Sequence, residues 1–490
     1  MPRKLNTKFY PLINTWKLNI YFFKIYFFIL TKKMSGVSER INVNDEFNLI
    51  DIRSKCPYDN RSDEEAINDL KKCFVYCESV PPVFMIKTYD SINENMKVSY
   101  TNETVAKSMM KKVIINTRLM NDRMKNYSLW DLFNDNQLEF TVKGLKFYSE
   151  DKQVFSYFRG YDYKKLDKVK DEVIRPFLNH VHDVIANNNE EVYKYIILWI
   201  ASILQQPSFK TETALVILGR QGTGKNTFFT NVICKLMSRY ANENVTSIES
   251  VVGKFNAVLE NKKLIILNEL QSIDSNKYLN SDALKSVITD KKININQKNE
   301  PERLTDNVAN FIMVSNNSNP IKIENGDRRY VVTKTSNKHK DDFDYFESLS
   351  NSFTPEFYEN LFTFFMTIDL KNVNLRKLPM TESKEDIKEA SMSSYELFVR
   401  ECYEEIHNIT GPDLFNKYND FVEKNKFKPC SSRTFIANIK EFTGKAEAKW
   451  IGGMTQKVYS LLPEVYDEMK KYNDDLEKQI VGDSIDEEAL

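Results

Sequence analysis

A glycine-rich stretch near the middle of the chain has the composition of a phosphate-binding loop. Residues 219–227 read Gly-Arg-Gln-Gly-Thr-Gly-Lys-Asn-Thr and hold three of only 13 glycines in 490 residues. Glycines let backbone N–H groups turn toward phosphate oxygens, and the lysine neutralises the β- and γ-phosphates. The pattern predicts an ATP site, with Lys225 on the phosphates. Its predicted binding residues are Gly219, Gln221, Gly222, Thr223, Gly224, Lys225, Asn226 and Thr227.

The residue after the lysine departs from the usual pattern. A phosphate loop of this type has Ser or Thr there, whose hydroxyl binds Mg²⁺, and this chain has Asn226. An amide oxygen is also a hard donor, so we expect Asn226 or Thr227 to ligate Mg²⁺ directly or through water.

A second candidate group lies about forty residues downstream. Leu264 to Leu267 is a short apolar run followed by Asn268 and Glu269. In a phosphate-loop ATPase, acidic residues at this position hold the metal and orient the attacking water. We expect Glu269 to activate the water. Asn268 takes the metal-side position without a charge, which predicts weak metal affinity more than a loss of nucleotide binding.

Two further motifs fit the same chemistry. The apolar run from Asn310 to Val314 is followed by Ser-Asn-Asn, which places the amide of Asn316 where it can sense the γ-phosphate. Arg328 and Arg329 precede the next apolar run. An arginine supplied by a neighbouring subunit stabilises charge on the transferring phosphoryl group.

Lysines between these motifs are candidates for nucleic-acid contact. Residues 291–303 alternate in polarity around a polar tip, which predicts a β-hairpin. Lys285, Lys292 and Lys298 are the predicted DNA-binding residues. The alternative is an exposed hairpin whose charges are merely solvated.

The elements that must position these residues follow from hydrophobic periodicity. Short continuous apolar runs, including 213–218, predict buried parallel strands, and helical stretches separate them. Residues 210–335 therefore read as an α/β sheet domain. Helical periodicity dominates our reading of residues 106–205, while residues 35–105 read as polar and irregular.

Composition sets outer limits on the function. The chain has 69 basic and 69 acidic residues, and 41% of its residues are hydrophobic. These values exclude a multi-span membrane protein and argue against coating nucleic acid by bulk charge. Six dispersed cysteines favour a reducing, intracellular compartment. For His180 and His182, packing is the expected role rather than metal binding.

Residues 1–33 contain no Asp or Glu, and their 13-residue apolar stretch is too short to span a bilayer. We expect translation to start at Met34, and a targeting or anchor segment is the alternative.

Together, the ordered motifs at 219–227, 264–269, 285–298, 315–317 and 327–329 resemble a superfamily 3 helicase, within the branch of the poxvirus-type primase–helicases. Stretches at 154–161, 177–181 and 196–200 resemble the helical domain that precedes the ATPase in this branch, and 378–383 resembles the segment that follows it. The resemblance covers about residues 110–460. It implies an AAA+-like, P-loop core with a parallel sheet, a homo-oligomeric ring (a hexamer), ATP and Mg²⁺ at subunit interfaces and single-stranded DNA in the pore.

The same resemblance sets the expected organisation. Expected segments are an upstream extension (1–33), a region of unknown role (34–105), a helical domain (106–205), the ATPase core (206–340), a helical linker (341–394), a winged-helix-like domain (395–465) and an acidic disordered tail (466–490). Within the winged-helix-like domain, Ser431 is the predicted N-cap of the second DNA-facing helix. A lid packed on the ATPase is the alternative reading of this domain. No paired acidic metal motif precedes the matched region, so a separate primase or polymerase is an expected partner.

The leading hypothesis is therefore an ATP-dependent DNA helicase that acts on single-stranded or forked DNA in the replication of a virus or mobile element. In a virus it would work in the host cytoplasm or nucleus, without a membrane partner. One alternative is a replication-initiation or DNA-tethering factor whose degenerate site binds ATP but turns it over poorly. Another is a ring-forming or packaging ATPase.

Overall fold

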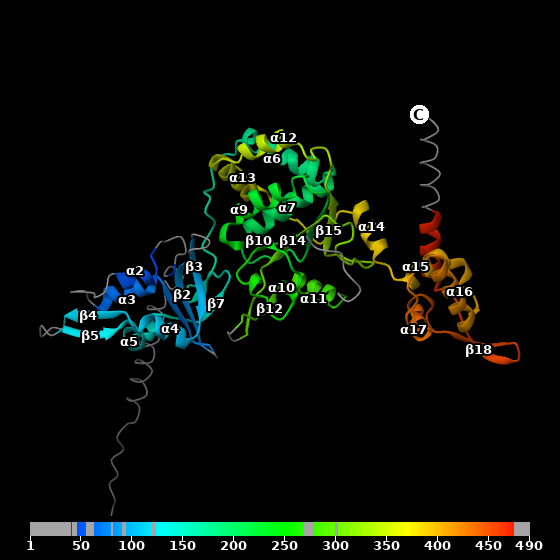
Figure 1. Cartoon of the computed structure of the whole chain (residues 1–490), viewed down its shortest axis with the longest axis horizontal. Helices are drawn as coiled ribbons and strands as arrows, with labels where there is room; N and C mark the ends of the chain where they lie inside the picture. The colour runs from blue at the N-terminus through cyan, green and yellow to red at the C-terminus, as the bar shows by residue number, and fades with distance from the viewer. Residues whose placement is uncertain are drawn as a thin grey trace, which may run out of the picture. The chain divides into compact units, whose positions relative to one another are not determined.

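The computed structural model describes residues 41, 47–54, 63–79, 82–90, 95–118, 124–268, 278–298 and 302–474. By contacts the chain divides into two compact units (Figure 1). The first comprises residues up to 321 together with 327–384, and the second comprises 322–326 together with residues from 385 onward. Among the described residues, no helix combines the length and the apolarity that crossing a bilayer requires. The predicted upstream extension (1–33) lies outside the described residues.

A five-stranded parallel sheet forms the centre of the first unit. Its strand order is β10-β11-β14-β9-β15, and every neighbouring pair is parallel. The strands are β9 (Ala214–Leu218), β10 (Ala241–Val245), β11 (Leu264–Asn268), β14 (Asn310–Ser315) and β15 (Tyr330–Lys334). The three central strands are buried on both faces, apart from the last residue of β11. The strands predicted from continuous apolar runs are therefore confirmed, and so is the α/β fold.

Helices that precede and follow the strands along the chain complete the core around the sheet. The main ones are α6 (Asp171–His180), the π-helical turn η3 (Val181–Ile185), α7 (Glu190–Gln205) and α13 (Pro355–Thr367). Trp199 of α7 is fully buried, and its Nε1 donates to Thr213 Oγ1 at 3.2 Å, directly before β9. Phe177 of α6 contacts Phe228 and Phe357. These contacts fix α6 and α7 against the strand that leads into the glycine-rich loop.

Three short helical segments follow that loop, namely α8 (Lys225–Phe228), η4 (Phe229–Cys234) and α9 (Lys235–Met237). Between β10 and β14 lie α10 (Glu249–Val252), α11 (Tyr278–Thr289), β12 (Lys292–Ile295) and β13 (Arg303–Asp306). Strands β12 and β13 pair antiparallel, which confirms the predicted hairpin. After the sheet, the chain continues through α12 (Phe343–Asn351), α13 and α14 (Glu382–Ala390).

The region before residue 160 differs from the sequence interpretation. Instead of polar and irregular chain, residues 63–142 hold a four-stranded sheet of order β3-β2-β1-β6 with a buried aromatic core around Phe74 and Phe133. The elements are α2 (Leu49–Ser54), α3 (Asp63–Lys71), β1 (Phe74–Cys77), β2 (Val83–Asp90), β3 (Asn95–Thr101), α4 (Glu103–Met110), β4 (Ile114–Arg118), β5 (Met124–Ser128), α5 (Leu129–Asp135), β6 (Thr141–Val142), β7 (Gly144–Lys146) and β8 (Val154–Ser156). The expectation that helices dominate residues 106–205 was wrong for its first half, where five short strands occur, and right for α6 and α7.

The second unit contains a small antiparallel sheet of order β16-β18-β17 together with helices (Figure 1). Its elements are α15 (Ser394–Glu401), β16 (Ile409–Thr410), α16 (Gly411–Lys424), α17 (Ser432–Thr443), β17 (Glu447–Ile451) and β18 (Met454–Tyr459). Phe398, Tyr418 and Phe435 form the centre of its core. Ser431 caps α17 by accepting from the Thr434 N–H, which confirms the predicted N-cap. Residues 466–474, expected to be disordered, belong to a helical stretch that covers 463–474. The rest of the predicted tail lies outside the described residues.

Candidate functional site

The glycine-rich loop joins the end of β9 to the start of α8, and its glycines are required by both conformation and space. Gly222 and Gly224 have φ of 82° and 81°, in the left-handed region that side chains other than glycine rarely adopt. A Cβ on Gly224 would lie 2.5 Å from the Phe346 ring and 2.7 Å from Cε1 of His180. A Cβ on Gly222 would overlap the carboxylate of Asp341. Phe346, His180 and Asp341 therefore pack closely against the loop and leave no room for a side chain at Gly222 or Gly224.

Lys225 begins the helix after the loop, and its ammonium is held by the loop itself. Its Nζ donates to the carbonyl oxygens of Gly219 (2.7 Å) and Arg220 (2.6 Å). Burial lowers the pKa of the Lys225 ammonium to about 8. These bonds hold the charged group beside the backbone N–H groups of the loop. A phosphate at the loop would find a positive charge that is already desolvated.

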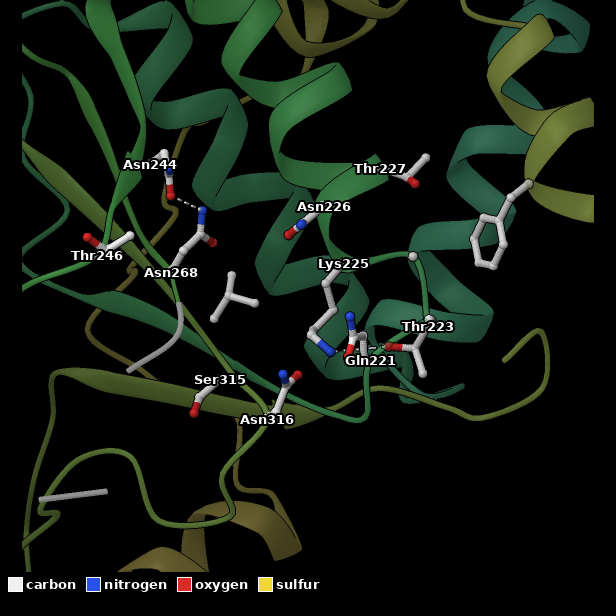
Figure 2. A pocket seen from close by; sticks show the side chains of 14 residues that line it. Gln221, Thr223, Lys225, Asn226, Thr227, Asn244, Thr246, Asn268, Ser315 and Asn316 are labelled. Atoms are coloured by element: carbon white, nitrogen blue, oxygen red, sulfur yellow. Dashed lines mark hydrogen bonds between the residues drawn. The ribbon is translucent and has the colours of Figure 1, made fainter. Parts of the chain in front are cut away.

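Residues from four other elements meet the loop in one pocket of about 480 Å³, which Figure 2 shows from close by. The loop supplies Gln221 to Thr227, β10 and the residue after its end supply Asn244 and Thr246, β11 supplies Asn268, β14 and the residue after its end supply Val314, Ser315 and Asn316, and α12 supplies Phe346. Because the strands are parallel, their carboxyl ends meet at one edge of the sheet, where ligands bind in open α/β folds. The volume falls within the range of small-molecule sites.

The oxygen donors of this pocket are neutral. Asn226 and Asn268 project toward one another from opposite sides in Figure 2, and Nδ2 of Asn268 donates to Glu243 O (3.1 Å) and Asn244 Oδ1 (3.2 Å). Among the described lining residues there is no Asp or Glu. Amide and hydroxyl oxygens suit Mg²⁺, but they add no negative charge. The described donor set therefore fits a magnesium ion that is held chiefly by the phosphates of a bound nucleotide.

The predicted water-activating carboxylate cannot be placed. Glu269 directly follows the end of β11 in sequence, next to Asn268, but it lies outside the described residues. Its role stays a prediction. Asn316, the predicted sensor, does line the pocket, and it follows a strand that pairs with β9.

The predicted arginine pair lies at the other end of the sheet. Arg328 and Arg329 precede β15, whose first residue pairs with Ala214 at the start of β9. A five-residue strand spans roughly 16 Å, so neither arginine shares the pocket of its own chain. Arg328 is exposed, whereas Arg329 forms a 3.3 Å ion pair with Asp327. Neither arginine can therefore reach the phosphates in the pocket of its own molecule, and their predicted role at a neighbouring molecule's site stays a prediction.

The three lysines predicted to bind DNA have different surroundings. Lys285 is only 9% exposed on α11 and pairs with Asp282 at 3.0 Å, so it is poorly placed to reach a phosphate. Lys292 pairs with Asp306 across the β12–β13 hairpin. Lys298 is exposed beyond the end of β12, beside residues 299–301, which lie outside the described part. Of the three, Lys298 keeps the geometry that the prediction needs.

Sequence reasoning expected His180 to pack, which its burial confirms, but it did not connect His180, Tyr345 or Thr335 to the glycine-rich loop. His180 is 1% exposed, and its Nδ1 lies 3.1 Å from the Tyr345 hydroxyl. Burial lowers the pKa of this imidazole to about 4. Thr335, at the end of β15, donates to Thr223 Oγ1 at 3.0 Å. Of these residues, only Thr335 could have been found from the sequence, because the residue after an apolar strand that pairs with β9 must lie near the loop. His182, the other predicted packing histidine, contacts Asp183 (2.8 Å) and Glu190 (3.4 Å).

Asn244 and Thr246 were also missed. Strand β10 reads Ala-Asn-Glu-Asn-Val and is largely accessible, so it carries no apolar signal. Its position follows only from pairing with β11. Edge strands of this kind escape a search for continuous hydrophobic runs.

Comparisons with known proteins show what the chain is similar to. Residues 217–329 match a family of unknown function, DUF5906. A DNA primase-polymerase of Nitratiruptor phage NrS-1 is 30% identical over 238 residues, which cover 47% of this chain. The match spans 31% of the length of that relative. The apo structure of the NrS-1 C-terminal region superposes with a TM-score of 0.55 at 19% identity, and the match covers 80% of this chain and 97% of that one. A second apo form gives a TM-score of 0.54 at 18% identity. This chain therefore shares its mixed α/β fold with that region.

Proposed function

We propose that this chain is an ATP-dependent DNA helicase of the superfamily 3 type that acts in the replication of a phage, another virus or a mobile element. The observation that supports this most is the single pocket in which the glycine-rich loop, Lys225, Asn268 and Asn316 meet at the carboxyl edge of a parallel sheet. The order β10-β11-β14-β9-β15 places one strand between the loop strand and the strand that precedes Glu269. This is the arrangement that an AAA+-like core needs for water activation and γ-phosphate sensing.

In this proposal the groups of the chain have distinct tasks. Backbone N–H groups of the loop and the Lys225 ammonium bind the β- and γ-phosphates, because both are fixed before the ligand arrives. Asn226, Thr227 and Asn268 supply oxygens around Mg²⁺, which when bound would neutralise phosphate charge. Glu269 orients and deprotonates the attacking water, and Asn316 hydrogen-bonds the γ-phosphate.

Completion of the site requires a second copy of the chain. The arginine pair lies at the opposite end of the sheet from the loop of its own molecule. A ring, with six members by the family resemblance, would bring Arg328 or Arg329 of one subunit to the ATP of the next. The exposed Lys298 would then face the channel that holds single-stranded DNA.

The second unit supports a DNA-binding role. Its order of helix, strand, helix, helix and antiparallel hairpin is that of a winged helix-turn-helix domain. In this class the second helix of the pair enters a groove or lies on the backbone, and here that helix is α17. The NrS-1 relative is a DNA primase-polymerase, which also supports a role on DNA. A separate primase or polymerase is the expected partner.

Unwinding of a forked duplex tests the proposal. The full chain with ATP and Mg²⁺ should release the labelled strand of a fork, and Lys225→Ala should stop release without unfolding the protein. Mass measurement in the presence of nucleotide should detect a ring. Absence of unwinding together with absence of ATP turnover would refute the proposal.

One observation favours a second candidate, a replication-initiation or DNA-tethering factor. Asn226 and Asn268 both stand where metal-side donors are expected, and the described lining contains no carboxylate. Such a protein would bind ATP tightly and hydrolyse it slowly. Tight ATP binding without turnover, combined with DNA binding, would decide for this candidate.

A further inference from the structure

The tip of the β17–β18 hairpin exposes large apolar side chains. Trp450 is 75% exposed and Met454 is 59% exposed, while the neighbouring Ile451 is 37% exposed. Tryptophan is usually well buried, and an exposed apolar group rimmed by polar residues marks an interaction site. Trp130 and Trp199, in contrast, are 6% and 0% exposed. Folding of the second unit does not need the Trp450 ring.

The turn between the two strands consists of two glycines and therefore has no side chains. Gly452 and Gly453 have φ of 61° and 85°, as a two-residue turn of type I′ requires, and nothing lies within 4 Å of a Cβ at either position. The tip thus ends in backbone, with Trp450 and Met454 just behind it. Figure 1 shows the hairpin extending from the helices of its unit. This shape can enter a narrow space between planar groups.

The hairpin and the chain that precedes it are rich in basic residues. Ala448 pairs with Lys457 and Trp450 with Thr455 across the two strands, so Trp450 and Lys457 share one face of the hairpin. Between residues 426 and 457 there are seven basic residues (Lys426, Lys428, Arg433, Lys440, Lys445, Lys449 and Lys457) and two acidic ones (Glu441 and Glu447). Among the described residues, Lys449 is the one of these seven with an ion pair, to Glu447. The charge fits a polyanion.

A groove of about 780 Å³ adjoins the hairpin. Asn416, Ser432, Gln456 and Lys457 contribute polar groups to it, and Phe415 and Met454 contribute apolar surface. A channel that mixes donors with apolar side chains suits a chain of phosphates and bases. An aromatic ring beside a lysine suits the same ligand, because every base has a face on which indole can stack.

From these observations we infer that the β17–β18 hairpin binds single-stranded DNA by stacking Trp450 on an unpaired base, while Lys457 contacts the adjacent phosphate. The proposal goes beyond ATP hydrolysis, because no residue of the nucleotide pocket takes part. A double helix offers no free base face, so the hairpin selects single strands or the junction at which a duplex opens.

The intrinsic fluorescence of Trp450 gives a direct test in the full chain. Trp16→Phe removes the tryptophan that lies outside the described residues, and the buried Trp130 and Trp199 leave Trp450 as the ring that acrylamide reaches. A twelve-nucleotide oligo(dT) should protect Trp450 from acrylamide. A blunt duplex of equal phosphate content and a phosphatidylserine vesicle should not.

Substitutions supply the second arm of the test. Trp450→Ala should weaken oligo(dT) binding on the order of tenfold, and Trp450→Phe should restore most of it. Tyr466→Ala, at an aromatic residue 38% exposed in the same unit, is the matched control and should have no effect. Lys457→Ala should reduce the log–log salt slope by about 0.7. ATP turnover without DNA should stay unchanged in each variant. A failure of the hairpin inference can therefore be told apart from a failure of the ATPase proposal.

Three outcomes would overturn the inference. Equal protection by the blunt duplex would make the hairpin a reader of double-stranded DNA, and protection by the vesicle alone would assign it to a membrane surface. Unchanged oligo(dT) affinity in Trp450→Ala would remove the stacking contact.

Discussion

Two turns of this molecule contain glycine pairs with the same backbone conformation but opposite surroundings. Gly222 and Gly224 in the loop, and Gly452 and Gly453 in the hairpin, all have φ between 61° and 85°. A Cβ at Gly224 would overlap Phe346 and His180, whereas the hairpin glycines face open space. Conformation alone explains the hairpin glycines, and close packing is an additional requirement in the loop. The comparison separates a turn that merely reverses the chain from one that is built into a site.

The side chains next to the two turns also differ, since one is buried and the other is exposed. Lys225 is 7% exposed and is held by loop carbonyls, while Trp450 is 75% exposed. The first arrangement fixes a charge for a small ligand that enters a pocket. The second displays a surface to a large ligand that approaches from solvent. Substitution and titration at these positions test the difference.

Alanine at the two kinds of glycine should have unequal costs. Gly224→Ala combines left-handed strain of about 1–2 kcal/mol with overpacking of about 1–3 kcal/mol. We expect the free energy of unfolding of the first unit to fall by about 2–5 kcal/mol and ATP binding to be lost. Gly452→Ala should cost only the strain. Urea denaturation and binding of a fluorescent ATP analogue measure both, and equal losses would contradict the comparison.

Acid should weaken the packing behind the loop. Burial lowers the pKa of His180 to about 4, below the value of about 6.5 in an unfolded chain. The unfolded state therefore binds more protons between these values, and stability falls as pH drops from 6.5 to 4, by up to about 3 kcal/mol. Denaturation at several pH values should show a shallower acid loss in His180→Gln. Identical pH profiles for the two proteins would show that His180 stays neutral without cost.

ATP affinity should depend on the protonation of Lys225. With a pKa of about 8 for this ammonium, affinity should fall about tenfold per pH unit above 8, because only the charged form pairs with phosphate. Lys225→Arg keeps its charge and should give a flat profile over the same range. Titration of an ATP analogue at pH 7 to 9.5 measures this effect. A flat profile for the unmodified chain would contradict the burial of the ammonium.

A threonine at position 226 should change the metal requirement only modestly. Asn226→Thr introduces the hydroxyl that Mg²⁺ usually binds at this position, so the Mg²⁺ concentration for half-maximal turnover should fall by about threefold. Asn416→Thr, at an asparagine that lines the groove of the second unit, is the matched control. A higher Mg²⁺ requirement in Asn226→Thr would mean that the amide is the better ligand.

Much of the central sheet was predictable, because its buried strands are continuous apolar runs. Strands 214–218, 264–268, 310–315 and 330–334 agree with the sequence interpretation. Strand β10 escaped because it is polar and exposed at an edge. The sheet before residue 143 escaped because strands such as Phe74–Cys77 are only four residues long and pair with segments distant in sequence. Short buried strands give no reliable period.

The pocket was predictable where it follows the strand ends and unpredictable where it depends on packing. Asn268 ends β11, Asn316 directly follows β14, and Lys225 closes the glycine-rich loop that leaves the end of β9, so parallel pairing of these strands brings the three side chains to one edge of the sheet. His180 and Phe346 reach the loop from α6 and α12, and no spacing rule connects these segments to residue 224. Burial of Lys285 was equally invisible, since a lysine on a helix is normally solvated.

Steady-state ATP turnover with and without single-stranded DNA decides whether the pocket is an ATPase site. The full chain should hydrolyse ATP, and DNA should raise the rate. Lys225→Ala and Glu269→Gln should each lower turnover by about 100-fold or more while leaving the unfolding midpoint unchanged. An unmodified chain that binds ATP without hydrolysing it, or a Lys225→Ala protein that retains turnover, would contradict the account.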